Sequence, residues 1–336
     1  MNLSLFRHDD GVVQNIVAIV YTLAAWIGGV SLIASSDWWI NALGILVLAH
    51  SLVFAAYFLH EFAHGTVFRN RQANLIGGEV ASWIVGASYA PFADLRRMHM
   101  RHHADRADPI TFDYRAFLRD CPPTVRGFVI VMEYCYVPAV EFLMRGFVML
   151  LPFIEPERRR ARGRVVLVLV GRVIFFSFLA WLALKALLLY FIAYILFVTV
   201  LRFTDAYQHT FDVLTTDRLT EFQKDKIRDR AYEQNNTYSN LVSVSHPWMN
   251  LLLLNFGYHN AHHAKPSVPW HRLPALHREM FESNNQQVIP MRTLLKGFHR
   301  DRLRRVLSDD YGAVSIGHNK VDGFYGAVGV SFLTAV

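Results

Sequence analysis

Long uninterrupted apolar runs alternate with polar segments along this chain. Two of these runs extend from Val12 to Ala34 and from Trp38 to Leu59, with a short polar break between them. A third covers residues 165–203 and contains only three basic residues. At about 1.5 Å per residue, that run is too long for one helix across an apolar bilayer core about 30 Å thick. It therefore predicts two helices joined by a turn near Lys185. The pattern as a whole predicts four transmembrane helices in two hairpins.

Basic residues lie beside these runs on one predicted side of the membrane. Arg7 precedes the first run, Arg69 and Arg71 follow the second, and an arginine-rich cluster at residues 158–164 precedes the third. Only Lys185 lies near the opposite side. Because loops rich in Lys and Arg stay in the cytoplasm, we expect both termini and the open ends of the hairpins to be cytoplasmic.

The remaining segments are less apolar. Residues 75–92 are rich in glycine and small residues, and residues 127–154 are apolar but carry charges. Both predict helices that lie at the membrane interface or re-enter it. Residues 205–310 are mixed and polar, as expected for a helical cytoplasmic cap. The predicted fold class is an all-α integral membrane protein, with one domain over residues 1–310 and a C-terminal tail over 311–336.

Composition and charge agree with a membrane protein. Hydrophobic residues make up 53% of the chain, against about 45–50% in soluble domains. The net charge of +7 is concentrated beside apolar runs, and no nucleic-acid-binding motif is present, so we expect no nucleic-acid partner. The two cysteines, Cys121 and Cys135, cannot by themselves build a four-cysteine zinc site or hold an iron–sulfur cluster. The sequence also has no CxxCH haem motif and no GxGxxG loop, so electrons for any redox reaction must come from outside.

Three histidine clusters stand out among the sixteen histidines. They are HEFAH at residues 60–64, HMRHH at 99–103 and HNAHH at 259–263. On a helix, positions i, i+3 and i+4 share one face, so each cluster can direct its ring nitrogens at one point. The candidate ligands are His60, His64, His99, His102, His103, His259, His262 and His263. Eight histidines exceed the needs of one zinc ion, and the HExxH of zinc proteases does not include two further clusters.

The three motifs, in this order, make the chain resemble the membrane-bound fatty acid desaturase and hydroxylase superfamily. HEFAH, HMRHH and HNAHH match that family's HxxxH, HxxHH and HxxHH, and the resemblance covers about residues 15–280. It implies a centre of two irons held by histidines on the cytoplasmic side. It also implies O2 as co-substrate for breaking an unreactive C–H bond, and a separate electron donor. The chain departs from the family where Ala104-Asp105 follow the second motif, since some members have Thr-Asn there.

The same resemblance implies a ninth ligand. Several members carry a histidine in a context like QHT between the last span and the third motif, which matches His209 here. We expect the last span to continue as a helix to His209, with Asp205 one turn earlier as its hydrogen-bond partner. His246 competes for this role, but it precedes Pro247 and is interpreted as structural.

Other residues near the clusters have weaker assignments. Carboxylates that could orient ligating histidines are Glu61, Asp94, Asp108, Asp205, Asp212 and Glu233. His271 and His277 are expected at the surface.

Three functions remain open. The first is an O2-dependent acyl desaturase of the EC 1.14.19 type. It would act on a lipid or an acyl thioester of CoA or a carrier protein, with a ferredoxin, rubredoxin or cytochrome as donor. The second is a hydroxylase or monooxygenase of a lipid, alkane or carotenoid at the same centre. The third is a histidine-rich metal transporter or receptor, which is disfavoured because transporters place their ligands near the bilayer midplane.

Overall fold

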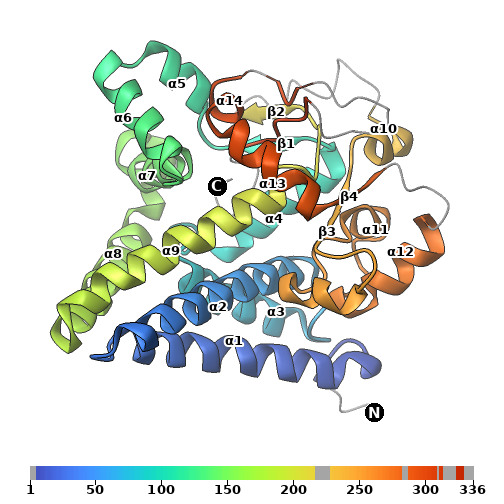
Figure 1. Ribbon diagram of the computed structural model, residues 1–336, viewed down its shortest axis with the longest axis horizontal. Helices are drawn as coiled ribbons and strands as arrows, with labels where there is room; N and C mark the ends of the chain where they lie inside the picture. The colour runs from blue at the N-terminus through green and yellow to red at the C-terminus, as the bar shows by residue number, and fades with distance from the viewer. Residues whose placement is uncertain (1–4, 216–227, 282–286, 309, 313–322, 329–336) are drawn as a thin grey trace. The chain divides into compact units, whose positions relative to one another are not determined.

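The computed structural model describes residues 5–215, 228–281, 287–308, 310–312 and 323–328. Within these ranges the chain is mainly helical (Figure 1), which confirms the predicted fold class. The described chain also contains four three-residue strands, which the sequence did not predict. They form two parallel pairs, β1 (Asp108–Ile110) with β2 (Val213–Thr215) and β3 (Ser239–Leu241) with β4 (Val288–Pro290). The chain forms two compact units. The first comprises residues 1–94 and 148–200, and the second comprises residues 95–147 and 201–336.

Among the residues that the structure describes, four helices have the length and composition of membrane spans, as predicted. They are α1 (Val12–Ile33), α2 (Trp38–His64), α8 (Arg162–Leu182) and α9 (Leu184–Asp205). Their most apolar windows have mean hydropathies of 2.2 to 2.5. Large apolar side chains such as Trp39, Trp181 and Leu184 are exposed on them, as expected for surfaces that face lipid. The chain is an integral membrane protein.

Both predicted helix junctions are present in the first unit. Asp37 caps α2 by accepting hydrogen bonds from the backbone N–H of Trp39 and Ile40. Asn41 donates to three backbone carbonyls at the end of α1 and in the turn, so the α1–α2 junction is fixed. The break between α8 and α9 falls at Ala183, whose backbone is extended. Beside it, Lys185 Nζ donates to Asn41 Oδ1 at 2.8 Å.

The two less apolar stretches, residues 75–92 and 127–154, each contain a break between helices. The first contains most of α3 (Arg71–Val85), which ends at the left-handed Gly86, and the next helix is α4 (Phe92–Asp105). The second contains α6 (Pro123–Tyr134) and α7 (Ala139–Ile154). The segment between α6 and α7 includes Tyr136 at φ 62° and Pro138. Neither residue suits a continuous helix, so the helical structure predicted there is present as two helices.

Short helices and the two strand pairs build the rest of the second unit. The helices are α5 (Tyr114–Asp120), α10 (Arg230–Asn235), α11 (His259–Ala264), α12 (Leu273–Phe281), α13 (Met291–Arg300) and α14 (Arg302–Leu307). At the end of α9, the buried Arg202 pairs with Glu133 of α6 and Glu141 of α7. This pairing attaches both helices to α9.

Residues 323–328 also belong to the core of the second unit. Phe324 is fully buried and packs against Tyr207 and Tyr238. The backbone N–H of Ala327 donates to the carbonyl of Ala206 at 2.7 Å. This part of the expected C-terminal tail is therefore packed, while a domain boundary at residue 310 stays a prediction.

Candidate metal centre

The first histidine motif forms the last turn of α2, in the first unit. His60 and His64 share one helix face, with ring centroids 4.7 Å apart, and His60 is buried. Gly65 ends the helix in the left-handed conformation at φ 65°, with its N–H bonded to carbonyls of the last turn. Thr66 Oγ1 then donates to Glu61 Oε2 at 2.6 Å. The helix end is thus fixed directly beside the two imidazoles.

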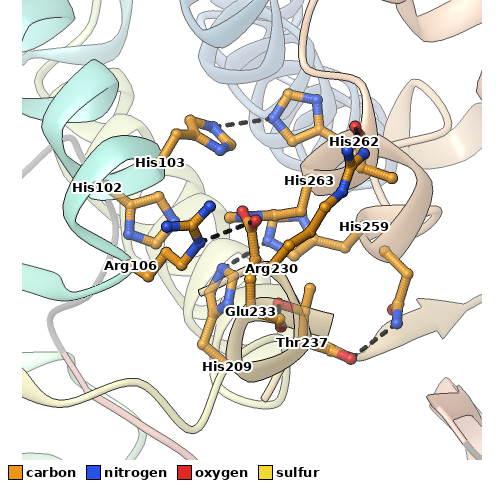
Figure 2. A network of polar contacts seen from close by, with 12 residues as sticks. His102, His103, Arg106, His209, Arg230, Glu233, Thr237, His259, His262 and His263 are labelled. Carbon is orange, nitrogen blue, oxygen red and sulfur yellow. Dashed lines mark hydrogen bonds and ion pairs between the residues drawn. The ribbon is translucent and has the colours of Figure 1, made fainter. Parts of the chain in front are cut away.

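The second and third motifs lie in the second unit, on α4 and α11. Their histidines form two groups together with His209. Figure 2 labels all of these histidines except His99. In the first group, the ligand nitrogens of His99, His103 and His262 lie within 4.8 Å of one another. In the second group, those of His102, His209 and His263 do so. Each group therefore draws on more than one segment of the chain.

Close nitrogen–nitrogen distances support both groups. The Nε2 atom of His103 lies 3.2 Å from that of His99 and 3.2 Å from that of His262. The Nε2 atom of His259 lies 2.7 Å from that of His209, which adds His259 to the second group. The third motif thus supplies one histidine to the first group and two to the second.

His209 reaches the second group from a turn, not from a helix. The helix α9 ends at Asp205, and His209 forms an isolated β-bridge with Thr237. Its Nδ1 has no hydrogen-bond partner within the described part of the chain. The expected helical continuation and the expected contact with Asp205 were therefore wrong. His246 is exposed and hydrogen-bonds Ser245 at 2.9 Å.

Two of the candidate carboxylates contact histidines of the second group. His102 Nδ1 lies 2.9 Å from the carbonyl of Ala107 and 3.1 Å from Asp108 Oδ1. His263 Nδ1 lies 3.0 Å from Glu233 Oε1. Such contacts fix a ligating imidazole in one orientation and one tautomer, with Nε2 left for a metal. Asp212 instead pairs with Arg228.

Burial determines the protonation of two histidines of the second group, His209 and His263. It lowers the pKa of His209 and of His263 well below the usual value, and the neighbouring imidazoles lower both further. The two rings are therefore neutral, as metal ligation requires. His263 Nε2 is buried and has no hydrogen-bond partner among the described residues. A buried imidazole lone pair beside two other ring nitrogens fits a metal such as iron, zinc, copper or nickel.

The sequence did not indicate the roles of two residues in this unit, Arg106 and His277. Arg106, three residues after the second motif, donates from Nε to Glu233 Oε2 at 3.1 Å. No local pattern pairs two residues so distant in sequence. His277, expected at the surface, is buried between Tyr258 and Phe281. The helical spacing of Leu273, Leu276 and His277 could have indicated its inward position.

Comparison with known proteins agrees with this geometry. The profile of the fatty acid desaturase family matches residues 36–295, which is more than half of the chain and includes all three histidine motifs. A search of curated proteins found no match. Family membership implies a lipid substrate, a di-iron type of centre and an external electron donor in general terms. The chain therefore belongs to the fatty acid desaturase family, within the superfamily of membrane-bound desaturases and hydroxylases, and is an oxidoreductase.

Proposed function

We propose that the chain is an acyl desaturase that uses O2 and external electrons to introduce a double bond into an acyl chain. The observation that carries the proposal is the pair of histidine groups in the second unit, each with ligand nitrogens within 4.8 Å. His60 and His64 are added on the family motif. The proposed ligands of two irons are His60, His64, His99, His102, His103, His209, His259, His262 and His263.

When bound, the irons would activate O2 for attack on an unreactive C–H bond. The contributions of the chain are binding and orientation. Glu233 accepts a hydrogen bond from Nδ1 of His263. Nδ1 of His102 bonds the carbonyl of Ala107 at 2.9 Å and lies 3.1 Å from Asp108 Oδ1. These contacts leave each Nε2 lone pair for a metal. Burial keeps His209 and His263 neutral, so no proton competes for their ligating nitrogens at neutral pH.

The reaction balances only with an outside reductant. Two hydrogens leave adjacent carbons of the acyl chain, and O2 takes them up with two protons and two electrons to give two waters. The sequence holds no haem motif, cluster-forming cysteine set or nucleotide loop. A ferredoxin, rubredoxin or cytochrome would supply the electrons, and the substrate would be a lipid or an acyl thioester of CoA or a carrier protein.

Hydroxylation of a lipid, alkane or carotenoid is the second candidate, because the same superfamily and the same ligand set support it. Expression in a host that lacks desaturases, followed by mass spectrometry of total lipids, separates the two. Desaturation predicts a product lighter by two hydrogens, and hydroxylation predicts one heavier by an oxygen. The His102→Ala variant is the matched control and should give neither product. A new product that persists in this control would contradict the proposed centre.

A further inference from the structure

Glu233 lies outside all three histidine motifs, yet it contacts the centre directly (Figure 2). It belongs to α10 and is buried. Its Oε1 faces His263 Nδ1 at 3.0 Å, and its Oε2 accepts from Arg106 Nε at 3.1 Å. The hydroxyl of Thr237 donates to the Glu233 carbonyl at 2.7 Å. Both the side chain and the backbone of Glu233 are therefore held in place.

The short helix α10 is also attached to α11, which carries the third motif. Arg230 donates to the carbonyl of Ala264 at the end of α11, at 2.9 Å. From the other side, the Asn260 side chain of α11 donates to the carbonyl of Thr237 at 2.8 Å. These bonds fix the distance between Glu233 and His263 independently of their own contact.

Two roles for the Glu233 carboxylate can be separated by geometry. One of its oxygens lies within 4.8 Å of ligand nitrogens of His103 and His263, so direct ligation of a metal is one role to consider. However, both oxygens already accept hydrogen bonds. Oε1 also faces Nδ1 of His263, whereas the buried Nε2 of that ring lacks a partner in the described chain. The carboxylate therefore contacts Nδ1 of the His263 ring and not Nε2, the nitrogen that is available to a metal.

Arg106 holds the other side of this carboxylate. It directly follows α4, which carries the second motif, and has a left-handed backbone at φ 50°. That conformation is unfavourable for a residue with a Cβ and persists only where the surroundings impose it. Besides Glu233, the guanidinium binds the carbonyl of Arg228 at 2.6 Å. These two contacts hold the arginine at the end of the second motif.

We infer that Arg106 and Glu233 form a positioning pair for His263. Glu233 fixes the tautomer and orientation of the His263 ring. Arg106 acts through Glu233, because it balances the charge of the Glu233 carboxylate and fixes the orientation of that carboxylate. The pair links the helix of the second motif to a ligand of the third. This inference rests on the proposed function, because it presumes that His263 binds a metal.

A double-mutant cycle with Co2+ as the probe tests the pair. The proteins are the purified, metal-stripped full chain and its Arg106→Gln, Glu233→Gln and double variants, titrated with Co2+ by visible absorption. Arg119→Gln is the control, because Arg119 is exposed and pairs only with the exposed Asp120 among its described contacts. The thermal midpoint of each metal-free protein is measured in parallel.

The expected result is a selective loss of metal affinity. Glu233→Gln should weaken the site that contains His263 by about tenfold to a hundredfold, with a changed cobalt spectrum. Arg106→Gln should weaken it by about tenfold, and the double variant should be no weaker than Glu233→Gln, since Arg106 acts through Glu233. The double variant should also melt closer to the wild type than Glu233→Gln does, because no half-buried guanidinium is left without its carboxylate.

A purely structural role for the pair gives a different outcome. Cobalt affinity would then recover together with stability in the double variant, which would overturn the inference. Wild-type affinity in Glu233→Gln would overturn it as well. If the wild-type protein itself bound no Co2+ and contained no iron, the proposed function would fail. Metal binding that is equal in all variants would leave that function intact.

Discussion

Among single residues, His209 and His246 occupy similar places in the sequence but differ in burial and in their contacts. Both lie between the last span and the third motif, so order along the chain does not separate them. His209 is buried against His102, His259 and His263. His246 is exposed beside Ser245. The family resemblance already predicts this contrast, but a continuing helix does not explain it, because α9 ends at Asp205.

We expect His209→Ala to reduce the iron bound per chain, and activity with it, because the variant removes one of the four ligand nitrogens of the second group. His246→Ala should leave iron content unchanged, and it serves as the matched control. Iron and protein are quantified on the same purified samples. The reverse ranking would refute the assignment of His209.

Arg202 should be essential for stability, because it neutralises two carboxylates that lie away from water. The side chains of Arg202, Glu133 and Glu141 are at most 7% exposed. Replacing Arg202 with Met leaves two buried acids without their cation, which should cost about 3–5 kcal/mol. Arg300→Met is the control, because the Arg300 side chain is 51% exposed and such pairs contribute about 0–1 kcal/mol. Unfolding midpoints in detergent measure both, and equal midpoints would contradict this account.

At the scale of elements, the sequence predicts the long helices well and the short ones poorly. Apolar runs near 20 residues have few alternatives to a membrane helix, and all four were found. The six-residue helices α10 and α11 and the strand pair β1–β2 depend on tertiary contacts instead. Strand β1 holds Asp108 beside His102 by pairing with β2, about one hundred residues away in sequence. No local pattern reports that pairing.

The segment 323–328 should support the position of His209, because it is bonded to the residues that precede it. Gly326 has φ 83°, and a Cβ there would lie 2.6 Å from the carbonyl oxygen of Ala206. We therefore expect Gly326→Ala to destabilise the protein by about 1–3 kcal/mol and to lower bound iron. The measurements are the unfolding midpoint and iron per chain.

Gly127→Ala is the matched control for this substitution. Gly127 lies within α6, and a Cβ there would meet nothing within 4 Å. Alanine should therefore be neutral or slightly stabilising by helix propensity. If Gly326→Ala behaved like Gly127→Ala, the segment would not support His209.

At the scale of the whole molecule, the distribution of basic residues predicts the topology. Both termini and residues 205–310 are proposed to be cytoplasmic, with only the turns near Asp37 and Lys185 outside. Single cysteines at the exposed positions Ser36 and Ser245, in a chain without Cys121 and Cys135, test this. An impermeant thiol reagent on intact cells should label position 36 and not position 245. Labelling of position 245 from outside would overturn the topology.

The nine proposed ligands could all be named from sequence, because motif spacing and family resemblance identify histidines directly. Their supporting residues could not be identified in the same way. Asp108 and Glu233 were two of six candidate carboxylates, and Arg106 had no signal at all. These residues are held in place by contacts between segments that are far apart in sequence, so their roles can be identified only in the folded unit.

A centre of two irons should be visible directly in the metal content of the purified protein. Iron and zinc are quantified per chain in the protein purified from iron-replete cells, beside a His262→Ala/His263→Ala variant. We expect close to two irons per wild-type chain, little zinc, and a marked loss of iron in the variant. About one zinc per chain without iron, or iron that is equal in the two proteins, would contradict it.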